Sequence, residues 1–135
     1  MFDTKIAILL NPDLETWQKL NVTAFLASGM TTTLPDLVGE PYVDAAGISH
    51  ARLLGHPMLI FSAAPEVLQR AWSQAISRDL QRAPYVRAMF STGHDAANRA
   101  VFLAEPAEAP DLVGLAVFGP KKDVDKAIKG ATLHP

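Results

Sequence analysis

The segment Ser91-Thr92-Gly93-His94-Asp95 contains the densest group of residue types that can take part in catalysis or ligand binding. Histidine titrates near neutral pH, so His94 could act as a general acid or base beside Ser91 as a nucleophile. Thr92 and Asp95 would then bind the ligand. The same segment is also typical of a helix start, because Ser, Thr and Asp satisfy free backbone N–H groups. No Gly-x-Ser-x-Gly motif accompanies Ser91, and both interpretations stay open.

A second polar segment, Asn11-Pro12-Asp13, follows the apolar run Ile6–Leu10. Polar groups at the carboxyl end of a buried strand often line a ligand site, so Asn11 and Asp13 are candidate binding residues. Aspartate is equally a preferred helix cap, and either Asp13 or Thr16 could cap the helix that follows. The sequence leaves the binding and capping roles of Asp13 open.

Lys19 and Asn21 lie early in that following helix. Lys19 has largely apolar neighbours and would bind or polarise an anionic group, although a lysine at such a position is commonly a solvated surface residue. Asn21 lies two residues further on, so it points away from Lys19 on a helix. We expect Asn21 to act as a binding residue near the Asn11 turn.

Apolar runs predict the four strands that position these segments. The first lacks polar–apolar alternation, so we expect it to be buried on both faces. Helical patterns separate the strands, which predicts an α/β fold in a single domain spanning 1–135. The expected strands cover 5–10, 58–61, 86–90 and 112–118.

The four expected helices differ in their hydrophobic patterns. Apolar residues cover most of the circumference of the first, which predicts a largely buried helix. The second has a clear 3.6-residue apolar stripe, and Pro84 should mark its exit. Their expected spans are 17–30, 65–80, 95–104 and 121–130.

Residues 34–57 form the least regular part of the chain, because Pro and Gly interrupt them repeatedly. Segments 42–44 and 48–50 could pair as a small hairpin around 45–47. The remainder is predicted to have little secondary structure, and such long loops are often functional or mobile.

Composition limits the classes of function. The run Ile6–Leu10 is far shorter than the roughly 20 apolar residues that span a bilayer, so we expect no membrane anchor. The absence of cysteine excludes disulfides, thiolate metal sites and cysteine nucleophiles, and it fits a cytoplasmic protein. His50 and His56 have no third ligand at a recognisable spacing, so we expect no metal and no cofactor. The net charge of −2 argues against extended binding to a phosphate backbone.

Four segments spread over the chain form a recognisable set: Leu10-Asn11-Pro12-Asp13-Leu14, Gly39-Glu40-Pro41-Tyr42-Val43-Asp44, Thr92-Gly93-His94 and Phe118-Gly119-Pro120-Lys121-Lys122-Asp123-Val124-Asp125-Lys126. Together they resemble the domain of unknown function 2000 family. That family in turn resembles peptidyl-tRNA hydrolase II, which implies a four-stranded mixed sheet with helices on both faces.

The resemblance also carries expectations about activity and partners. Lys19 lies near the position of the lysine that opens the first helix of that enzyme. The enzyme's Ala-Gln-x-x-His-Ala segment falls here at Thr23 to Leu26 and is not retained, and its Asp-Ala-Gly turn becomes Ser91-Thr92-Gly93. tRNA is therefore a candidate partner that the net charge disfavours. A homodimer is expected from the resemblance. It is also expected because side chains as large as those of Trp17, Met30 and Trp72 should exceed what one small core can bury.

Two functional hypotheses follow. In the first, the chain is a small hydrolase acting on an ester or amide that bears an anionic group. Its cleft would lie between Asn11–Asp13, Lys19 and the segment 91–95, with Lys19, His94 and Ser91 as catalytic residues. In the second, the chain is a ligand-binding or regulatory module that kept the fold without the chemistry, because the enzyme's histidine and acidic turn residue are missing. Either hypothesis implies a small-molecule ligand or substrate.

Overall fold

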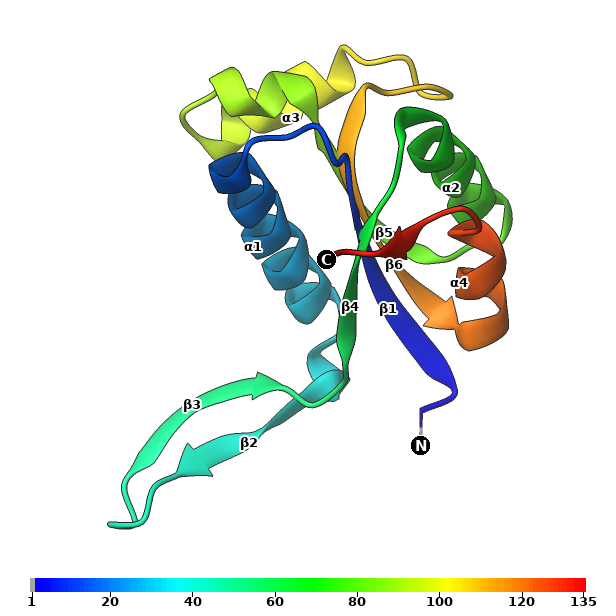
Figure 1. The fold of residues 1–135 in the computed structure, drawn as a ribbon. Helices are drawn as coiled ribbons and strands as arrows, with labels where there is room; N and C mark the ends of the chain where they lie inside the picture. Colours follow the sequence, from blue (N-terminus) through cyan, green and yellow to red (C-terminus); the bar gives the residue numbers. More distant parts are fainter. Residues whose placement is uncertain (1) are drawn as a thin grey trace.

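The computed structural model describes residues 2–135 and contains a mixed sheet, flanking helices and a separate hairpin (Figure 1). The α/β class expected from the sequence is confirmed. The strands are β1 (Thr4–Leu10), β2 (Val38–Val43), β3 (Ser49–Leu54), β4 (Met58–Ser62), β5 (Gln81–Val86), β6 (Leu112–Pro120) and β7 (Thr132–Leu133). The helices are α1 (Thr16–Thr33), α2 (Pro65–Ser77), α3 (Asp95–Leu103) and α4 (Lys121–Ala127), with 3-10 helices η1 (Pro35–Leu37) and η2 (Arg87–Ser91).

The main sheet has the strand order β5-β6-β1-β4-β7, so β1 lies at its centre. β1 pairs in parallel with β4, and every other pairing in this sheet is antiparallel. The mixed sheet is therefore confirmed, but the expected number of four strands is wrong. The fifth strand, β7, pairs Thr132 and Leu133 with the end of β4, and two residues are too few to give a recognisable strand pattern.

The central strand β1 is buried on both faces, as predicted. Ile6, Ile8 and Leu10 pack in the cluster that includes α1. Ala7 and Leu9 point to the opposite face and pack in the cluster that includes α2 and α4. Each of these five residues is at most 2% exposed. The sheet consequently has helices on both faces, with α1 opposite α2 and α4 (Figure 1).

Helix α1 is not largely buried, which corrects the expectation from its composition. Its buried residues are Val22, Leu26 and Met30, whereas Trp17 and Phe25 are each 56% exposed. The outer face stays open because the part of the sheet under α1 is covered by this single helix layer. An apolar circumference therefore reflects an apolar outer surface here and not burial on all sides.

A glycine on the sheet sets how closely α1 approaches. A Cβ atom added to Gly114 of β6 would lie 2.5 Å from Val22 Cγ1 and 3.2 Å from Leu26 Cδ1. Real Cβ atoms almost never come that close to another heavy atom. The missing side chain therefore allows α1 to pack directly on the backbone of the sheet.

The third expected strand is displaced. The structure places β5 at Gln81–Val86, and residues 87–91 form η2 instead of strand. Pro84, expected to end a helix, lies within β5 and pairs with Leu115 of β6. β5 is an edge strand with one neighbour, and proline is tolerated there because no second ladder needs its missing N–H.

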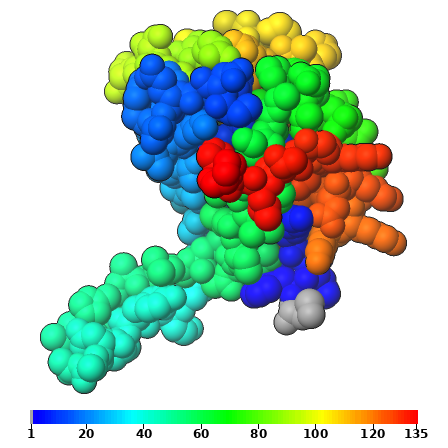
Figure 2. All heavy atoms as spheres, viewed as in Figure 1, coloured from blue at the N-terminus to red at the C-terminus, as the bar shows by residue number. Residues whose placement is uncertain are grey.

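Residues 38–54 form a hairpin that projects from the body, which we call the arm (Figure 2). The expected hairpin is confirmed, but β2 and β3 are longer than predicted, so most of 34–57 is not irregular. Asp44 organises the turn, since its carboxylate accepts hydrogen bonds from the backbone N–H groups of Ala46 and Ile48. Tyr42 and Leu53 are among the exposed apolar side chains of the arm.

Candidate functional site

The turn after β1 is built on Asn11 and not on Asp13. Asn11 is buried, its N–H donates to Val113 O over 2.9 Å, and its side-chain oxygen accepts from Asp13 N over 2.9 Å. The helix cap lies two residues later than Asp13, at Glu15, whose N–H donates to Gln18 Oε1. The proposed capping roles of Asp13 and Thr16 are therefore wrong, because a turn with a buried Leu14 separates Asp13 from the helix.

Lys19 lines a cavity of about 420 Å³ between α1 and the edge of the sheet, here called the Lys19 cavity. The rest of its lining is apolar or carries hydroxyl or imidazole groups: Leu10, Thr16, Leu20, Thr23, Ile60, His134 and Pro135. The Thr23 hydroxyl is already used, because it donates to the Lys19 carbonyl oxygen over 2.7 Å. Lys19 thus places a positive charge in a cavity whose lining is mostly apolar.

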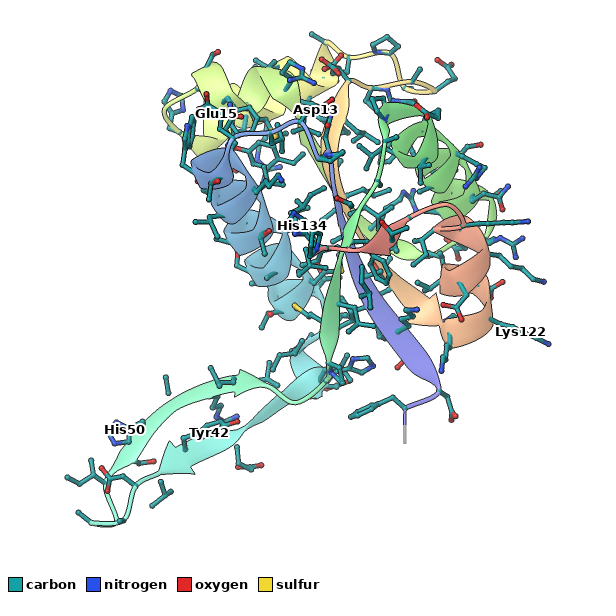
Figure 3. The ribbon with its side chains drawn as sticks, viewed as in Figure 1. Asp13, Glu15, Tyr42, His50, Lys122 and His134 are labelled. Atoms are coloured by element: carbon teal, nitrogen blue, oxygen red, sulfur yellow. The ribbon has the colours of Figure 1, made fainter. Side chains whose placement is uncertain are left out.

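His134 contributes the imidazole of the Lys19 cavity, a residue that the sequence reasoning assigned no role. Its backbone N–H donates to Ile60 O over 2.9 Å, which extends the β4–β7 pairing and holds the ring beside α1 (Figure 3). Its Nδ1 lies 3.0 Å from the backbone oxygen of Pro135, and because this oxygen can only accept a hydrogen bond, Nδ1 is the donor. Its Nε2 is buried and has no hydrogen-bond partner.

Asn21 lies on another side of α1 and lines a second cavity, of about 300 Å³, here called the Asn21 cavity. Its Nδ2 donates to the Tyr85 hydroxyl over 3.0 Å, so the expected contact with the Asn11 turn is wrong. The helical rotation of about 200° between positions 19 and 21 explains why the two side chains reach different cavities. Aromatic side chains form much of the lining, including Trp17 and Phe90.

The segment 91–95 forms the start of α3 and part of the Asn21 cavity. His94 is the helix cap, because its Nδ1 accepts the Ala97 N–H over 3.2 Å; the predicted cap by Ser91, Thr92 or Asp95 is therefore wrong. The Thr92 hydroxyl lies within hydrogen-bonding distance of two acceptors, Met89 O at 2.9 Å and Asn98 Oδ1, and its single proton can serve one of them at a time. Asp95 forms an exposed ion pair with Arg99.

The structure therefore does not bring the predicted site residues into one cleft. Lys19 lines one cavity, whereas Asn21, Thr92, His94 and Asp95 line the other. Neither cavity is lined by Asn11, Asp13 or Ser91, and Ser91 is exposed at the end of η2. A lysine and a histidine do line the same cavity, but the histidine is His134 and not His94.

The two remaining histidines, His50 and His56, lie outside both cavities and contact other parts of the protein. His56 is buried, with Nδ1 2.8 Å from Pro57 O and Nε2 3.0 Å from the Thr4 hydroxyl. His50 pairs with Asp44 on the arm over 2.9 Å. Within residues 2–135, no group of three His, Asp or Glu side chains could hold a metal ion. Across the same stretch, none of the helices combines the length and hydropathy needed to cross a membrane.

Comparisons with known proteins concern the whole chain. The model of a family described as "Protein of unknown function (DUF2000)" matches residues 4–135. A solved structure of a protein of unknown function from Agrobacterium tumefaciens strain C58 is 44% identical, with a TM-score of 0.96, and the match covers 100% of both chains. No curated protein matches the chain.

Proposed function

This chain belongs to the DUF2000 family, whose function is unknown, and from that premise we propose that it binds a small molecule in the Lys19 cavity. The observation that carries the proposal is the buried, unpartnered Nε2 of His134 in a cavity that Lys19 also lines. A buried polar atom without a partner is costly in a folded protein. A ligand that supplied the missing partner would remove that cost.

The lining defines the class of ligand. Leu10, Leu20 and Ile60 favour an apolar body, and Lys19 favours one anionic group. Because Nδ1 of His134 donates to Pro135, Nε2 accepts a proton or a hydrogen bond when the ring is neutral. A small apolar carboxylic acid meets both demands, since its proton can pass to Nε2 and leave a carboxylate between imidazolium and ammonium.

A titration with matched probes tests this proposal. Hexanoate and benzoate should give saturable shifts of the His134 ring signals in nuclear magnetic resonance spectra, whereas hexanol and hexylammonium should not. Lys19→Met keeps the length of the side chain but removes the charge, and it should weaken hexanoate binding about tenfold, as loss of one ion pair in a partly buried site implies. Lys122→Met, at an exposed lysine of α4, is the matched control.

A histidine pair sharpens the same experiment. His134→Gln should weaken hexanoate binding, and His50→Gln on the arm should leave it unchanged. In His134→Gln, which lacks the ring, the backbone amide signals of Leu20 and Ile60 report binding. Equal binding of hexanoate and hexanol, or hexanoate binding that is undiminished in both Lys19→Met and His134→Gln, would overturn the proposal.

Hydrolysis of an ester or amide with an anionic group is the second candidate, favoured by the meeting of a lysine and a histidine in one cavity. The division of Lys19 and His94 between two cavities makes binding without chemistry the function that we prefer. A panel of esters and amides that includes peptidyl-tRNA should show no turnover above buffer. Turnover lost in Lys19→Ala would establish hydrolysis, and parallel losses in His94→Ala and Ser91→Ala would restore the cleft expected from the sequence.

A likeness to peptidyl-tRNA hydrolase II remains part of the proposal. It is supported by the mixed sheet with β1 at the centre and helices on both faces. Binding of tRNA is the corresponding partner hypothesis, and the net charge of −2 disfavours it. A mobility-shift assay with tRNA at low salt tests tRNA binding separately from the fold likeness, since a similar fold does not require tRNA binding.

We also propose that the chain forms a homodimer. Met30 and Trp72 are buried in one copy, so the support comes instead from exposed apolar side chains on α1 and the arm, such as Trp17, Phe25 and Tyr42. Sedimentation at micromolar concentration should show a species of twice the 14.5 kDa chain mass. A single 14.5 kDa species would refute the dimer without affecting the Lys19 cavity.

A further inference from the structure

The Asn21 cavity is a separate feature that the proposed function does not use. Three stretches of sequence meet there: α1, the end of β5 with η2, and the start of α3. Its volume of about 300 Å³ suits a single small ring system, at the lower end of known ligand pockets. The class of ligand that fits this cavity therefore follows from its own lining and not from that of the Lys19 cavity.

Aromatic rings form a continuous row along this cavity. The ring centroids of Trp17 and Phe90 are 5.8 Å apart, those of Phe90 and Tyr85 are 5.3 Å apart, and those of Tyr85 and Phe25 are 6.2 Å apart. Trp17 and Phe25 at the two ends are more than half exposed. Exposed faces of aromatic side chains favour stacking with a planar group.

Polar groups are arranged beside the rings with unused hydrogen-bonding capacity. Asn21 uses one N–H on the Tyr85 hydroxyl, which leaves its carbonyl oxygen and second N–H without a recorded partner in residues 2–135. Tyr85 accepts that bond, so its own O–H can donate. Asn98 Oδ1 contacts the Thr92 hydroxyl, and the Asn98 side-chain N–H groups have no hydrogen-bond partner within the part of the chain that the structure describes, so they can donate. The cavity thus offers a donor and an acceptor on one carboxamide, with further donors beside it.

The charged groups of the lining do not favour an anionic ligand. No lysine or arginine lines the Asn21 cavity, and its one carboxylate, Asp95, is paired with Arg99 over 2.7 Å. The imidazole of His94 also lines the cavity, and its Nδ1 is already used as the acceptor of the Ala97 N–H. Burial raises the pKa of the Tyr85 hydroxyl above its ordinary value, and the Asn21 hydrogen bond opposes this in part, so the phenol is neutral near pH 7. A neutral ligand matches this lining, because its free hydrogen-bonding groups belong to amides and a phenol.

We propose that the Asn21 cavity binds an uncharged planar heterocycle that carries a donor and an acceptor side by side, as uracil and adenine do. The ring stacks against Trp17 and Phe90. Its edge forms paired hydrogen bonds with the Asn21 carboxamide, the geometry in which asparagine recognises such edges elsewhere. The site is independent of the Lys19 cavity, so either can fail without the other.

Side-chain amide signals give the direct test. Uracil or adenine should produce saturable shifts of the Asn21 and Asn98 side-chain amides and of the Trp17 indole N–H. Asn21→Leu, which removes the amide at similar volume, should weaken binding about tenfold, the loss expected for one paired contact. Gln81→Leu removes an exposed amide from β5 and should leave the affinity unchanged.

Two probes of different charge complete the design. Benzoate should leave these signals unshifted, since no lysine or arginine lines the cavity. Tetramethylammonium tests the competing idea of an aromatic cation site. Saturable binding of tetramethylammonium in the absence of uracil binding would overturn the proposal, as would uracil binding that is equally tight in Asn21→Leu. If Asn21→Leu fails to fold, Asn98→Ala at the cavity rim serves in its place.

Discussion

Helix α1 forms a wall of two cavities that differ in charge more than in size. The Lys19 cavity has a volume of about 420 Å³ and contains a cation and an unpartnered imidazole nitrogen. The Asn21 cavity has a volume of about 300 Å³ and is lined by amides, a phenol and aromatic rings, together with His94 and the ion-paired Asp95. Two positions on one turn of the helix therefore line two cavities with different chemical groups. The difference shows that polar residues close in sequence need not belong to one site.

The largest effect is expected from a substitution that displaces α1, the helix that borders both cavities. Gly114→Ala would place a Cβ atom 2.5 Å from Val22 Cγ1, so α1 must shift away from β6. Overpacking of this kind costs about 1–3 kcal/mol in the free energy of unfolding. Because α1 borders both cavities, hexanoate and uracil binding should weaken together. Urea unfolding and the two titrations check this result.

Gly29→Ala is the matched control for that change. Its added Cβ would lie 3.9 Å from the Ala83 Cβ, an ordinary contact, and alanine in a helix interior is favoured over glycine by about 0.5–1 kcal/mol. We expect unchanged or increased stability and unaltered binding. Equal destabilisation by Gly114→Ala and Gly29→Ala would show that close packing at Gly114 does not position α1.

The second prediction separates the two cavities. Lys19→Met should lower the affinity for hexanoate about tenfold and leave uracil binding unchanged, whereas Asn21→Leu should do the reverse. The physical reason is that charge carries recognition in one cavity and paired hydrogen bonds carry it in the other. Both ligands titrated into both variants give four affinities. A variant that weakened both ligands equally would mean that the cavities are coupled through α1.

Parts of this arrangement were accessible from sequence and parts were not. The unbroken apolar run of β1 predicted a strand buried on both faces, because few other structures accommodate such a run. The outer face of α1 was misjudged, since composition cannot distinguish a helix covered on all sides from one with an apolar surface. Pro84 was misplaced because its tolerance depends on β5 being an edge strand, which is a property of the whole sheet.

His134 illustrates the limit for the candidate site. No local pattern marks the residue, since β7 has only two residues and its position depends on pairing with β4. Lys19 was proposed from its apolar neighbours, but the histidine that lines the same cavity lies 115 positions later in the chain. Long-range pairing therefore decided which histidine joined the lysine, and His94 instead became the cap of α3.

The third prediction concerns the floor of the Asn21 cavity. Tyr85→Phe removes the acceptor of the Asn21 N–H and should cost about 1 kcal/mol in the free energy of unfolding. Tyr85 also makes stability depend on pH, because its pKa in the folded chain lies above the ordinary value of 10.0. The unfolded chain releases this proton first, so the stabilisation is present below pH 10 and is lost as the pH rises further.

Urea unfolding at several values from about pH 9 to about pH 11 should therefore show a steeper loss of stability in the wild type than in Tyr85→Phe. Tyr42→Phe removes an exposed hydroxyl on the arm and is the matched control. Identical slopes for wild type and Tyr85→Phe would contradict the assignment of Tyr85 as a buried, neutral donor. That outcome would weaken the Asn21 cavity and leave the Lys19 cavity untouched.

The smallest effect is expected on the arm, which is remote from both cavities. His50 beside Asp44 holds the pKa of that carboxyl below its ordinary value of 3.8, with help from the Ile48 N–H and against a small effect of burial. Asp44 therefore orders the turn above that pH, and the order is lost as the pH falls and the carboxylate is protonated. Asp44→Ala should speed hydrogen exchange at the Ala46 and Ile48 amides, which lose their acceptor.

Asp44→Asn separates the hydrogen bonds of the turn from the charge. The asparagine oxygen can still accept both N–H groups, so exchange at Ala46 and Ile48 should rise less than in Asp44→Ala. Hexanoate and uracil affinities should match the wild type in both variants, because neither cavity includes a residue of the arm. A changed affinity for either ligand would mean that the arm communicates with that cavity. Since isolated two-stranded hairpins are only marginally stable, the most direct route for such communication is an arm that packs against a second copy of the chain.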